Sequence, residues 1–147
     1  MYKRILLPYD GSDLSKKATK KGIAFAKSCG ASVVGFYSPE DYQIMLYSEY
    51  VPPNLLTKKE FEAQAKRTAE KYLAYIKKLA DDAGVSCETL YATSVNPWEA
   101  IIDAAKKKKC DLIFMASHGR RGIAGFLLGS HTQKVLTHSK IPVLVCR

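Results

Sequence analysis

Short runs of consecutive apolar residues alternate along this chain with longer stretches in which apolar residues recur every three or four positions. The short runs are typical of buried strands, and the longer stretches are typical of amphipathic helices. The pattern predicts strands over residues 2–8, 31–37, 85–93, 111–116 and 141–146. It predicts helices over residues 13–29, 55–83, 97–109 and 130–138, with a short helical turn at 123–128.

Residues that favour helix ends support these boundaries. Gly30 and Gly84 follow the first two helical stretches, where a glycine in the left-handed conformation commonly ends a helix. Asn96 and Pro97 form a strong start signal, with asparagine as the cap and proline at the first helical position. Ser130 is expected to cap the last helix.

The stretch from Ser38 to Asn54 shows no clear period and holds several prolines and tyrosines. Long connections of this kind are usually functional or mobile. It could form a lid over a site or an apolar surface for a partner, or fold back on the core of its own domain. The pattern favours none of these over the others.

Strands and helices alternate, so the sheet should be parallel with helices on both faces. The fold class is therefore α/β, and 147 residues are the size of one domain spanning 1–147. In such sheets ligands bind at the carboxyl ends of the strands, where the strand order reverses.

Composition indicates a globular protein that acts in the cytoplasm. No apolar run approaches the roughly 20 residues of a membrane helix, and the N-terminal apolar run is too short for a signal peptide. The four cysteines (Cys29, Cys87, Cys110 and Cys146) are widely spaced, so we expect small buried side chains rather than a metal or redox site.

The net charge of +9 arises from 23 Lys and Arg against 14 Asp and Glu. The lysine clusters fall on predicted helices, where they should form solvated outer faces. Aromatic residues are not interleaved with them, so nucleic acid is not an expected partner. The charge should still attract a small polyanionic ligand.

Candidate chemistry centres on two glycines. Gly119 follows the buried strand that ends at Ala116, and Gly129 precedes the last predicted helix. Glycine lets the backbone approach a ligand, and the first turn of a helix offers amide groups and positive potential. The arrangement suits a phosphate.

Other chemistries fit the sequence less well. Ser130 and His131 are neighbours on one helix and do not face each other, which argues against a hydrolase triad. Phosphate-loop, dinucleotide and zinc-protease motifs are absent, and no metal ligand set is expected. No residue stands out as a general base or nucleophile, so we expect at most slow catalysis rather than a dedicated enzyme.

The segment from Gly119 through nine spacer residues to Gly129-Ser130 resembles the signature G-x2-G-x9-G-[ST] of the universal stress protein family, with Ala116 in place of the first glycine. Residues 3–12, 96–102 and 141–145 resemble further parts of that family, so the likeness covers the whole chain. It implies the adenine nucleotide alpha hydrolase-like fold, with strand order 3-2-1-4-5. The reversal then lies between the first and fourth strands, where Asp10 should meet residues 117–119.

The resemblance also implies a site for ATP or a related adenine nucleotide. Asp10 would hold the adenosine part, Arg120 could reach the phosphates, and the family's phosphate contacts match Gly119, Gly129, Ser130 and His131. The remaining expected site residues are Pro8, Tyr9, Phe36, Tyr37, Met115, Ala116 and His118. Whether magnesium accompanies the ligand is left open.

Two departures affect this expectation: the methyl group of Ala116 could crowd the ribose, and His131 is larger than the residue usual there. The favoured function is a nucleotide-binding stress-response sensor or regulator. The alternative is a dimeric interaction module of the same family that binds no nucleotide. In either case we expect a homodimer, formed by pairing of the strand Ile141–Cys146, and a protein partner whose identity the sequence does not give.

Overall fold

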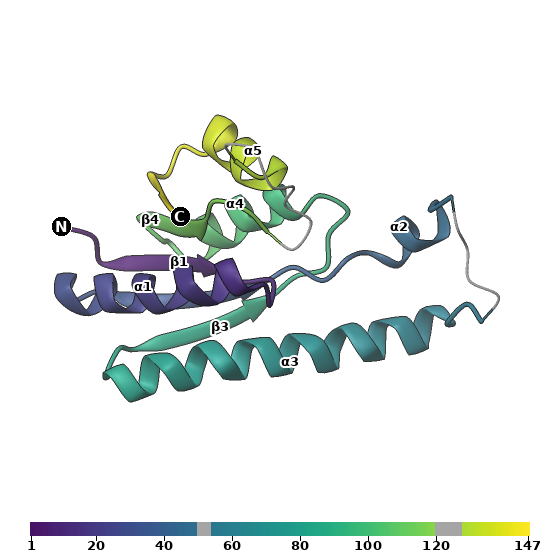
Figure 1. Cartoon of the computed structure of the whole chain (residues 1–147), viewed down its shortest axis with the longest axis horizontal. Helices are drawn as coiled ribbons and strands as arrows, with labels where there is room; N and C mark the ends of the chain where they lie inside the picture. The colour runs from purple at the N-terminus through teal and green to yellow at the C-terminus, as the bar shows by residue number, and fades with distance from the viewer. Residues whose placement is uncertain (50–53, 120–127) are drawn as a thin grey trace.

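Five parallel strands form one sheet in the order β3-β2-β1-β4-β5 (Figure 1). The computed structural model describes residues 1–49, 54–119 and 128–147. The strands are β1 (Arg4–Pro8), β2 (Ser32–Tyr37), β3 (Cys87–Tyr91), β4 (Leu112–Ala116) and β5 (Val143–Cys146). The helices in the described ranges are α1 (Asp13–Cys29), α2 (Tyr42–Leu46), α3 (Lys58–Ala83), α4 (Pro97–Lys107) and α5 (Ser130–His138). The predicted fold class and strand order are confirmed.

Helices cover both faces of the sheet, with α1 and α3 on one side and α4 and α5 on the other (Figure 1). The central strand β1 serves both layers, because successive side chains of a strand point to opposite faces. Ile5 and Leu7 pack in the cluster that contains α1 residues, whereas Leu6 packs in the cluster that contains α4 residues. Because helices cover both faces of the sheet, the inner strands are continuous apolar runs in the sequence.

Glycine ends two helices as predicted. Gly30 (φ 66°) and Gly84 (φ 71°) both adopt the left-handed conformation, and their amides donate to the last turns of α1 and α3. The helix α3 begins at Lys58 rather than 55, because Thr57 and Glu60 form a reciprocal capping box that fixes its first turn.

Of the two predicted caps, Asn96 is confirmed in position and Ser130 is wrong. Asn96 occupies the cap position of α4 but forms no side-chain cap hydrogen bond; its Nδ2 donates to Glu99 Oε1 at 3.4 Å instead. In α5 the cap position belongs to Gly129, and Ser130 is already the first helical residue. Ser130 therefore places its amide in the first turn of α5.

Some element bounds differ from the sequence prediction. The strand β3 is shorter than predicted and half-exposed, as expected for a strand at the sheet edge, and β5 starts at Val143 because Pro142 precedes it. In α4 the predicted inner face is buried at Ile101, Ile102 and Ala105. Trp98 on the same helix is half-buried and stacks on His138 of α5, with ring centroids 4.7 Å apart. The helical turn predicted at 123–128 lies outside the described residues except for Leu128.

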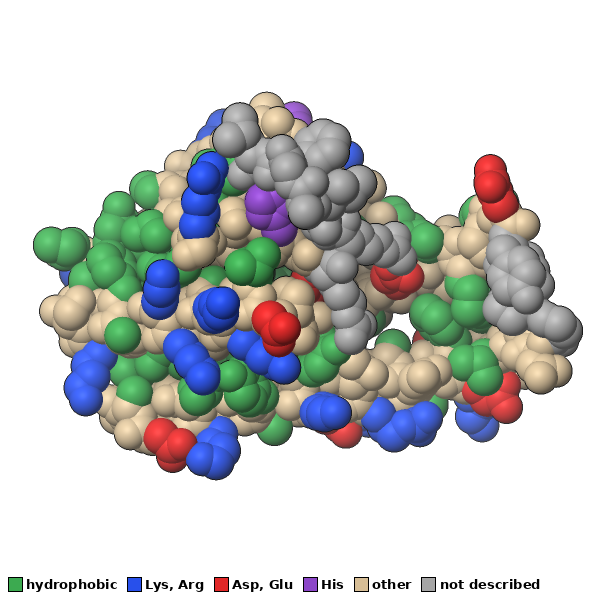
Figure 2. All heavy atoms as spheres, viewed as in Figure 1, with side chains coloured by type: hydrophobic (Ala, Val, Ile, Leu, Met, Phe, Trp, Pro, Cys, Tyr) green, Lys and Arg blue, Asp and Glu red, His purple; other side chains and the backbone are tan. Residues whose placement is uncertain are grey.

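Lysine and arginine side chains spread over the outer surfaces of α1 and α3 in Figure 2. Lys16, Lys17, Lys20 and Lys21 on α1 are all exposed, as predicted for a solvated helix face. At the end of α4, by contrast, Lys108 is half-buried and forms an ion pair with Glu88 of β3. Among the helices that the structure describes, none is both long and apolar enough to cross a membrane.

Candidate functional site

The carboxyl ends of β1 and β4 lie side by side, as the strand order predicts, and the turns that follow them form the candidate crevice. The two strands are neighbours, with Leu6 in register with Ile113. Asp10 follows β1 and Gly119 follows β4, and a Cβ atom placed on Gly119 would lie 2.7 Å from Asp10 Oδ2. The carboxylate therefore rests against the bare backbone of Gly119. Any larger residue at this position would have to displace it.

The Asp10 side chain is oriented by its own turn. Its Oδ1 accepts a hydrogen bond from the amide of Ser12 at 2.9 Å, and Ser12 in turn caps α1. Gly11 adopts a φ of 81°, which glycine accommodates without strain. The turn fixes one carboxylate oxygen and directs the other toward Gly119.

Gly129 brings the start of α5 against the end of β4. Its amide donates to the Ser117 carbonyl at 2.7 Å, and a Cβ on Gly129 would lie 3.2 Å from His118 Cα and 3.3 Å from Ser117 O. These neighbours are backbone atoms, which cannot move aside as a side chain can. The close approach places the first turn of α5, with its amide groups and the positive end of the helix dipole, beside the β4 turn.

The residue that replaces the first signature glycine lies in the hydrophobic core. Ala116 is 7% exposed and belongs to the apolar cluster that includes Leu7, Ala18 and Phe114. Its carbonyl accepts a hydrogen bond from the buried Thr132 Oγ1 at 3.0 Å, which ties β4 to α5. The methyl group thus contributes to packing against the α1 side of the sheet.

The other predicted site residues are distributed around this crevice in different environments. Ser117 Oγ and His118 Nδ1 lie 3.1 Å apart. Ser130 and His131 are exposed on α5, Pro8 and Tyr37 are half-buried at the ends of β1 and β2, and Met115 is buried within β4. The ring of Phe36 is 1% exposed and packs in the core beneath α4. Arg120 lies outside the described residues.

Tyr9 belongs to an aromatic cluster that the sequence analysis missed. Its ring packs against Tyr72 and Tyr75 of α3, at centroid distances of 5.2 and 5.4 Å. Burial raises the pKa of the Tyr9 phenol to about 12, with smaller contributions from Tyr75, Tyr72 and Asp10. In the sequence, Tyr72 lies within the predicted helix over residues 55–83, and nothing local distinguishes it from the other apolar positions there. The available signal was the pair of tyrosines three residues apart, which share one helix face.

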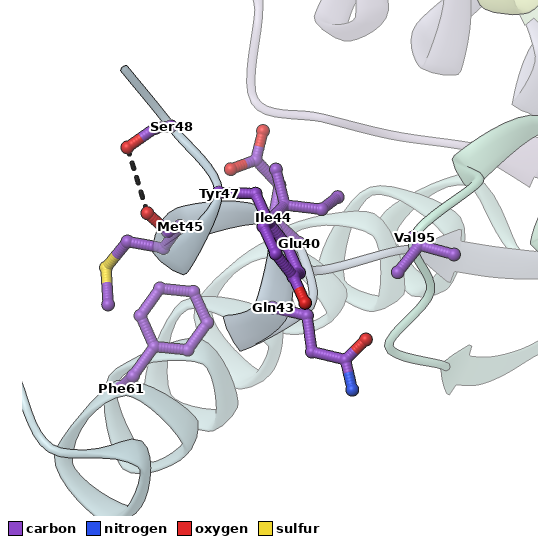
Figure 3. A pocket seen from close by; sticks show the side chains of 8 residues that line it. All are labelled: Glu40, Gln43, Ile44, Met45, Tyr47, Ser48, Phe61 and Val95. Carbon is purple, nitrogen blue, oxygen red and sulfur yellow. Dashed lines mark hydrogen bonds between the residues drawn. The ribbon is translucent and has the colours of Figure 1, made fainter. Parts of the chain in front are cut away.

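A groove lies where α2 faces the first turns of α3 (Figure 3). This groove of about 670 Å³ is lined by Glu40, Gln43, Ile44, Met45, Tyr47, Ser48, Phe61 and Val95. Tyr42 of α2 packs edge-on against Phe61 of α3, with centroids 5.4 Å apart. None of the α2 residues is buried, so this part of the 38–54 segment does not belong to the core.

The described residues include no group of three or more His, Cys, Asp or Glu side chains that could hold a metal ion. The four cysteines are free; Cys110 and Cys146 are buried, and Cys29 and Cys87 are half-buried. Burial raises the pKa of the Cys110 thiol to about 11, which keeps it protonated and unreactive.

Together, the parallel sheet and the convergence of Asp10, Gly119 and Gly129 define an open α/β protein whose candidate site lies where the strand order reverses. The sequence pattern described as the universal stress protein family matches residues 1–147. The chain belongs to the universal stress protein family.

Similar proteins support this assignment along the full length. The chain is 34% identical over 148 residues to the universal stress protein MJ0531 of Methanocaldococcus jannaschii, covering 100% of this chain and 83% of that protein. It is also 34% identical to a universal stress protein of Thermus aquaticus encoded in a sulfhydrylase 3′ region, with 100% of both chains covered.

Solved structures show the same architecture. That of MJ0577 superposes with a TM-score of 0.82 at 30% identity, covering 99% of this chain and 95% of that one. A universal stress protein in complex with cAMP has a TM-score of 0.72 at 24% identity, covering 99% and 97% of the two chains. One from Archaeoglobus fulgidus in complex with dAMP has a TM-score of 0.70 at 17% identity, covering 99% and 98%.

Proposed function

We propose that this protein binds ATP or a related adenine nucleotide in the crevice between β1 and β4, and that occupancy of the crevice serves as a signal in a stress response. The observation that supports this most directly is the convergence of Asp10, Gly119 and Gly129, where the absence of a side chain on each glycine allows the close approach of its neighbours. The proposed place of action is the cytoplasm.

The residues fit the chemistry of such a ligand. A carboxylate such as that of Asp10 accepts hydrogen bonds from ribose hydroxyls or an exocyclic amine, and it cannot donate to them. The amides at Gly119 and in the first turn of α5 suit phosphate oxygens. The two complexes with cAMP and dAMP have the same fold as this chain, which is compatible with the proposal. Pro8, Tyr9, Phe36, Tyr37, Met115, Ala116, His118, Arg120, Ser130 and His131 complete the proposed site.

Isothermal titration with ATP, with and without magnesium, tests this function. The matched variants are Asp10→Asn and Asp13→Asn, because both remove one carboxylate near the start of α1 and Asp13 is exposed. A hydrogen bond to a charged group contributes about 1.5–3 kcal/mol, so Asp10→Asn should weaken ATP binding roughly 10- to 100-fold. Asp13→Asn should have no such effect. Folded wild-type protein that releases no heat with ATP would refute nucleotide binding and leave the interaction module as the function.

We also propose that the protein is a homodimer that pairs through the strand predicted at Ile141–Cys146. The strand β5 is the last in the sheet order and pairs with β4. Pro142 O accepts a hydrogen bond from the Ile113 amide of β4, and Cys146 O accepts one from the Ser117 amide just after it. Val143 and Val145, at the alternate positions, therefore turn their backbone groups away from β4. An edge of this kind is a template for pairing with a second chain.

The substitution Val145→Pro tests the dimer, because proline removes one outward amide without removing a bond to β4. Light scattering at micromolar concentration should give the mass of a dimer for the wild type and of a monomer for Val145→Pro. Val145→Thr, which keeps the amide, is the matched control and should remain dimeric. A monomeric wild type would refute the proposal.

A further inference from the structure

Four tyrosines gather beside the Asp10 turn, on the side of the sheet that α3 covers. Tyr9 lies between Tyr72, which it meets edge-on at 90°, and Tyr75, with which it is nearly parallel at 28°. Tyr72 also meets Tyr37 edge-on, with centroids 4.9 Å apart. The cluster thus connects the carboxyl ends of β1 and β2, and α3 supplies two of its rings.

The members of the cluster differ in exposure. Tyr9 is only 5% exposed, so its ring is part of the core. Tyr37, Tyr72 and Tyr75 are half-buried, so each remains partly exposed to solvent. Tyr72 contacts both Tyr9 and Tyr37, whereas the ring contact described for Tyr75 is with Tyr9. Tyr72 is therefore the ring that joins the buried part of the cluster to the strand end at Tyr37.

The phenol end of Tyr72 lies directly over Gly11. A Cβ atom on Gly11 would overlap the Tyr72 hydroxyl oxygen and the ring carbon that carries it. Gly11 follows Asp10, whose carboxylate rests against Gly119. The Tyr72 ring therefore extends from Tyr37 to the turn that orients the Asp10 carboxylate, and Gly11 leaves the space that this requires.

We propose that Tyr72 is a specificity-determining residue of the crevice: the base of the nucleotide stacks on the Tyr72 ring, with Tyr37 edge-on beside it. Aromatic side chains beside a carboxylate and a phosphate-binding turn offer the three kinds of contact that a nucleotide needs at its base, sugar and phosphates. This inference deepens the proposed nucleotide-binding function and rests on it.

The test compares ATP with inorganic tripolyphosphate, which carries phosphates but no base, by isothermal titration. Tyr72→Leu removes the ring on which the base would stack, and the loss of that stacking energy should weaken ATP binding about tenfold. Tripolyphosphate binding should be unchanged by Tyr72→Leu. Tyr72→Phe keeps the ring and should bind ATP as the wild type does.

Tyr75→Leu is the matched control, because it removes a half-buried tyrosine from the same face of α3 and disturbs the same neighbour, Tyr9. It should leave ATP affinity unchanged, and circular dichroism establishes that each variant is folded. Equal ATP affinity of Tyr72→Leu and the wild type would overturn this inference alone. Equal losses for ATP and tripolyphosphate, or for both leucine variants, would also overturn it by showing a general structural effect. Failure of the wild type to bind ATP would overturn the proposed function as well.

Discussion

The two ends of the sheet use charged residues in opposite ways. At the amino end, the Asp111 carboxylate accepts hydrogen bonds from the amides of Lys3 and Arg4 at 2.8 and 3.0 Å, and Glu88 forms ion pairs with Arg4 and Lys108. At the carboxyl end, the Asp10 carboxylate rests against Gly119, which carries no charge. The amino end joins strands to one another, and the carboxyl end keeps backbone accessible.

This difference shows where the molecule gains stability and where it can bind. Hydrogen bonds from Lys108 and Arg4 hold the pKa of the Glu88 carboxyl below its usual range, as expected of a group whose charged form has cationic partners. Gly119 and Gly129 have no side chain to bury in the core. A Cβ atom at Gly119 would press on the Asp10 carboxylate, and one at Gly129 would press on the backbone of residues 117 and 118. Substitutions at the amino end should therefore alter stability, and those at the carboxyl end should alter binding.

The largest effect is expected for Gly129→Val. The added side chain would press on His118 Cα and Ser117 O, so the start of α5 would move away from β4. ATP affinity measured by titration should fall by about 100-fold or more, which corresponds to a loss of roughly 2.7 kcal/mol or more in binding free energy. Thr137→Val, an exposed position on the same helix, is the control. If Gly129→Val bound ATP as tightly as the wild type, the proposed difference between the two ends of the sheet would be wrong.

The substitution Asp111→Ala should reduce stability without changing ATP affinity. It removes the acceptor of the Lys3 and Arg4 amides, and hydrogen bonds to a charged group contribute about 1.5–3 kcal/mol. Urea denaturation gives the free energy of unfolding, with Asp103→Ala as an exposed control. A loss of ATP binding in folded Asp111→Ala protein would contradict the comparison.

The pH dependence of this stability difference sharpens the same prediction. Desolvation alone would raise the pKa of Asp111, but the hydrogen bonds from the Arg4 and Lys3 amides outweigh it and lower the pKa. The stabilisation should be complete above the unfolded pKa of about 3.9 and disappear as pH falls through the lower folded value. Urea titrations of wild type and Asp111→Ala between neutral pH and pH 2 measure this. A difference that grew toward low pH would contradict it.

A smaller loss of stability is expected for Gly11→Ala at the carboxyl end. The left-handed conformation costs a residue with a Cβ about 1–2 kcal/mol, and Tyr72 must also shift. Gly30→Ala is the matched control, because Gly30 has a similar φ and no atom within 4 Å of an added Cβ. Thermal denaturation should show a larger decrease for Gly11→Ala than for Gly30→Ala. Equal decreases would show that contact with Tyr72 contributes nothing.

The fold could be predicted largely because its signals are local. The apolar runs of the strands, the glycines at 30 and 84 and the proline at 97 each act within a few residues, and the structure confirms the elements they indicate. The strand order depends on contacts between distant segments, so it came only from family resemblance. The cap at Ser130 was wrong because Ser130 already lies in the first helical turn, after Gly129. Asn96 does occupy its predicted cap position, but its side chain donates to Glu99 and forms no cap hydrogen bond.

The meeting of Asp10 with the residues after β4 could be predicted once the strand order was known. The burial of the Ala116 methyl group could not, because the direction of a side chain at a strand end depends on the register and twist of the sheet. The Tyr72 contact with Gly11 was also missed, since it joins residues far apart in sequence through a helix whose rotation the periodicity fixes only approximately.

The stacking of Trp98 on His138 gives the protein an intrinsic optical reporter. The chain contains one tryptophan, so its fluorescence comes from a single place, the contact between α4 and the last residue of α5. The first turn of that same helix adjoins the proposed phosphate site. Any ligand that shifts α5 along or away from α4 would change the emission of one indole, and the response could be followed without attaching a dye.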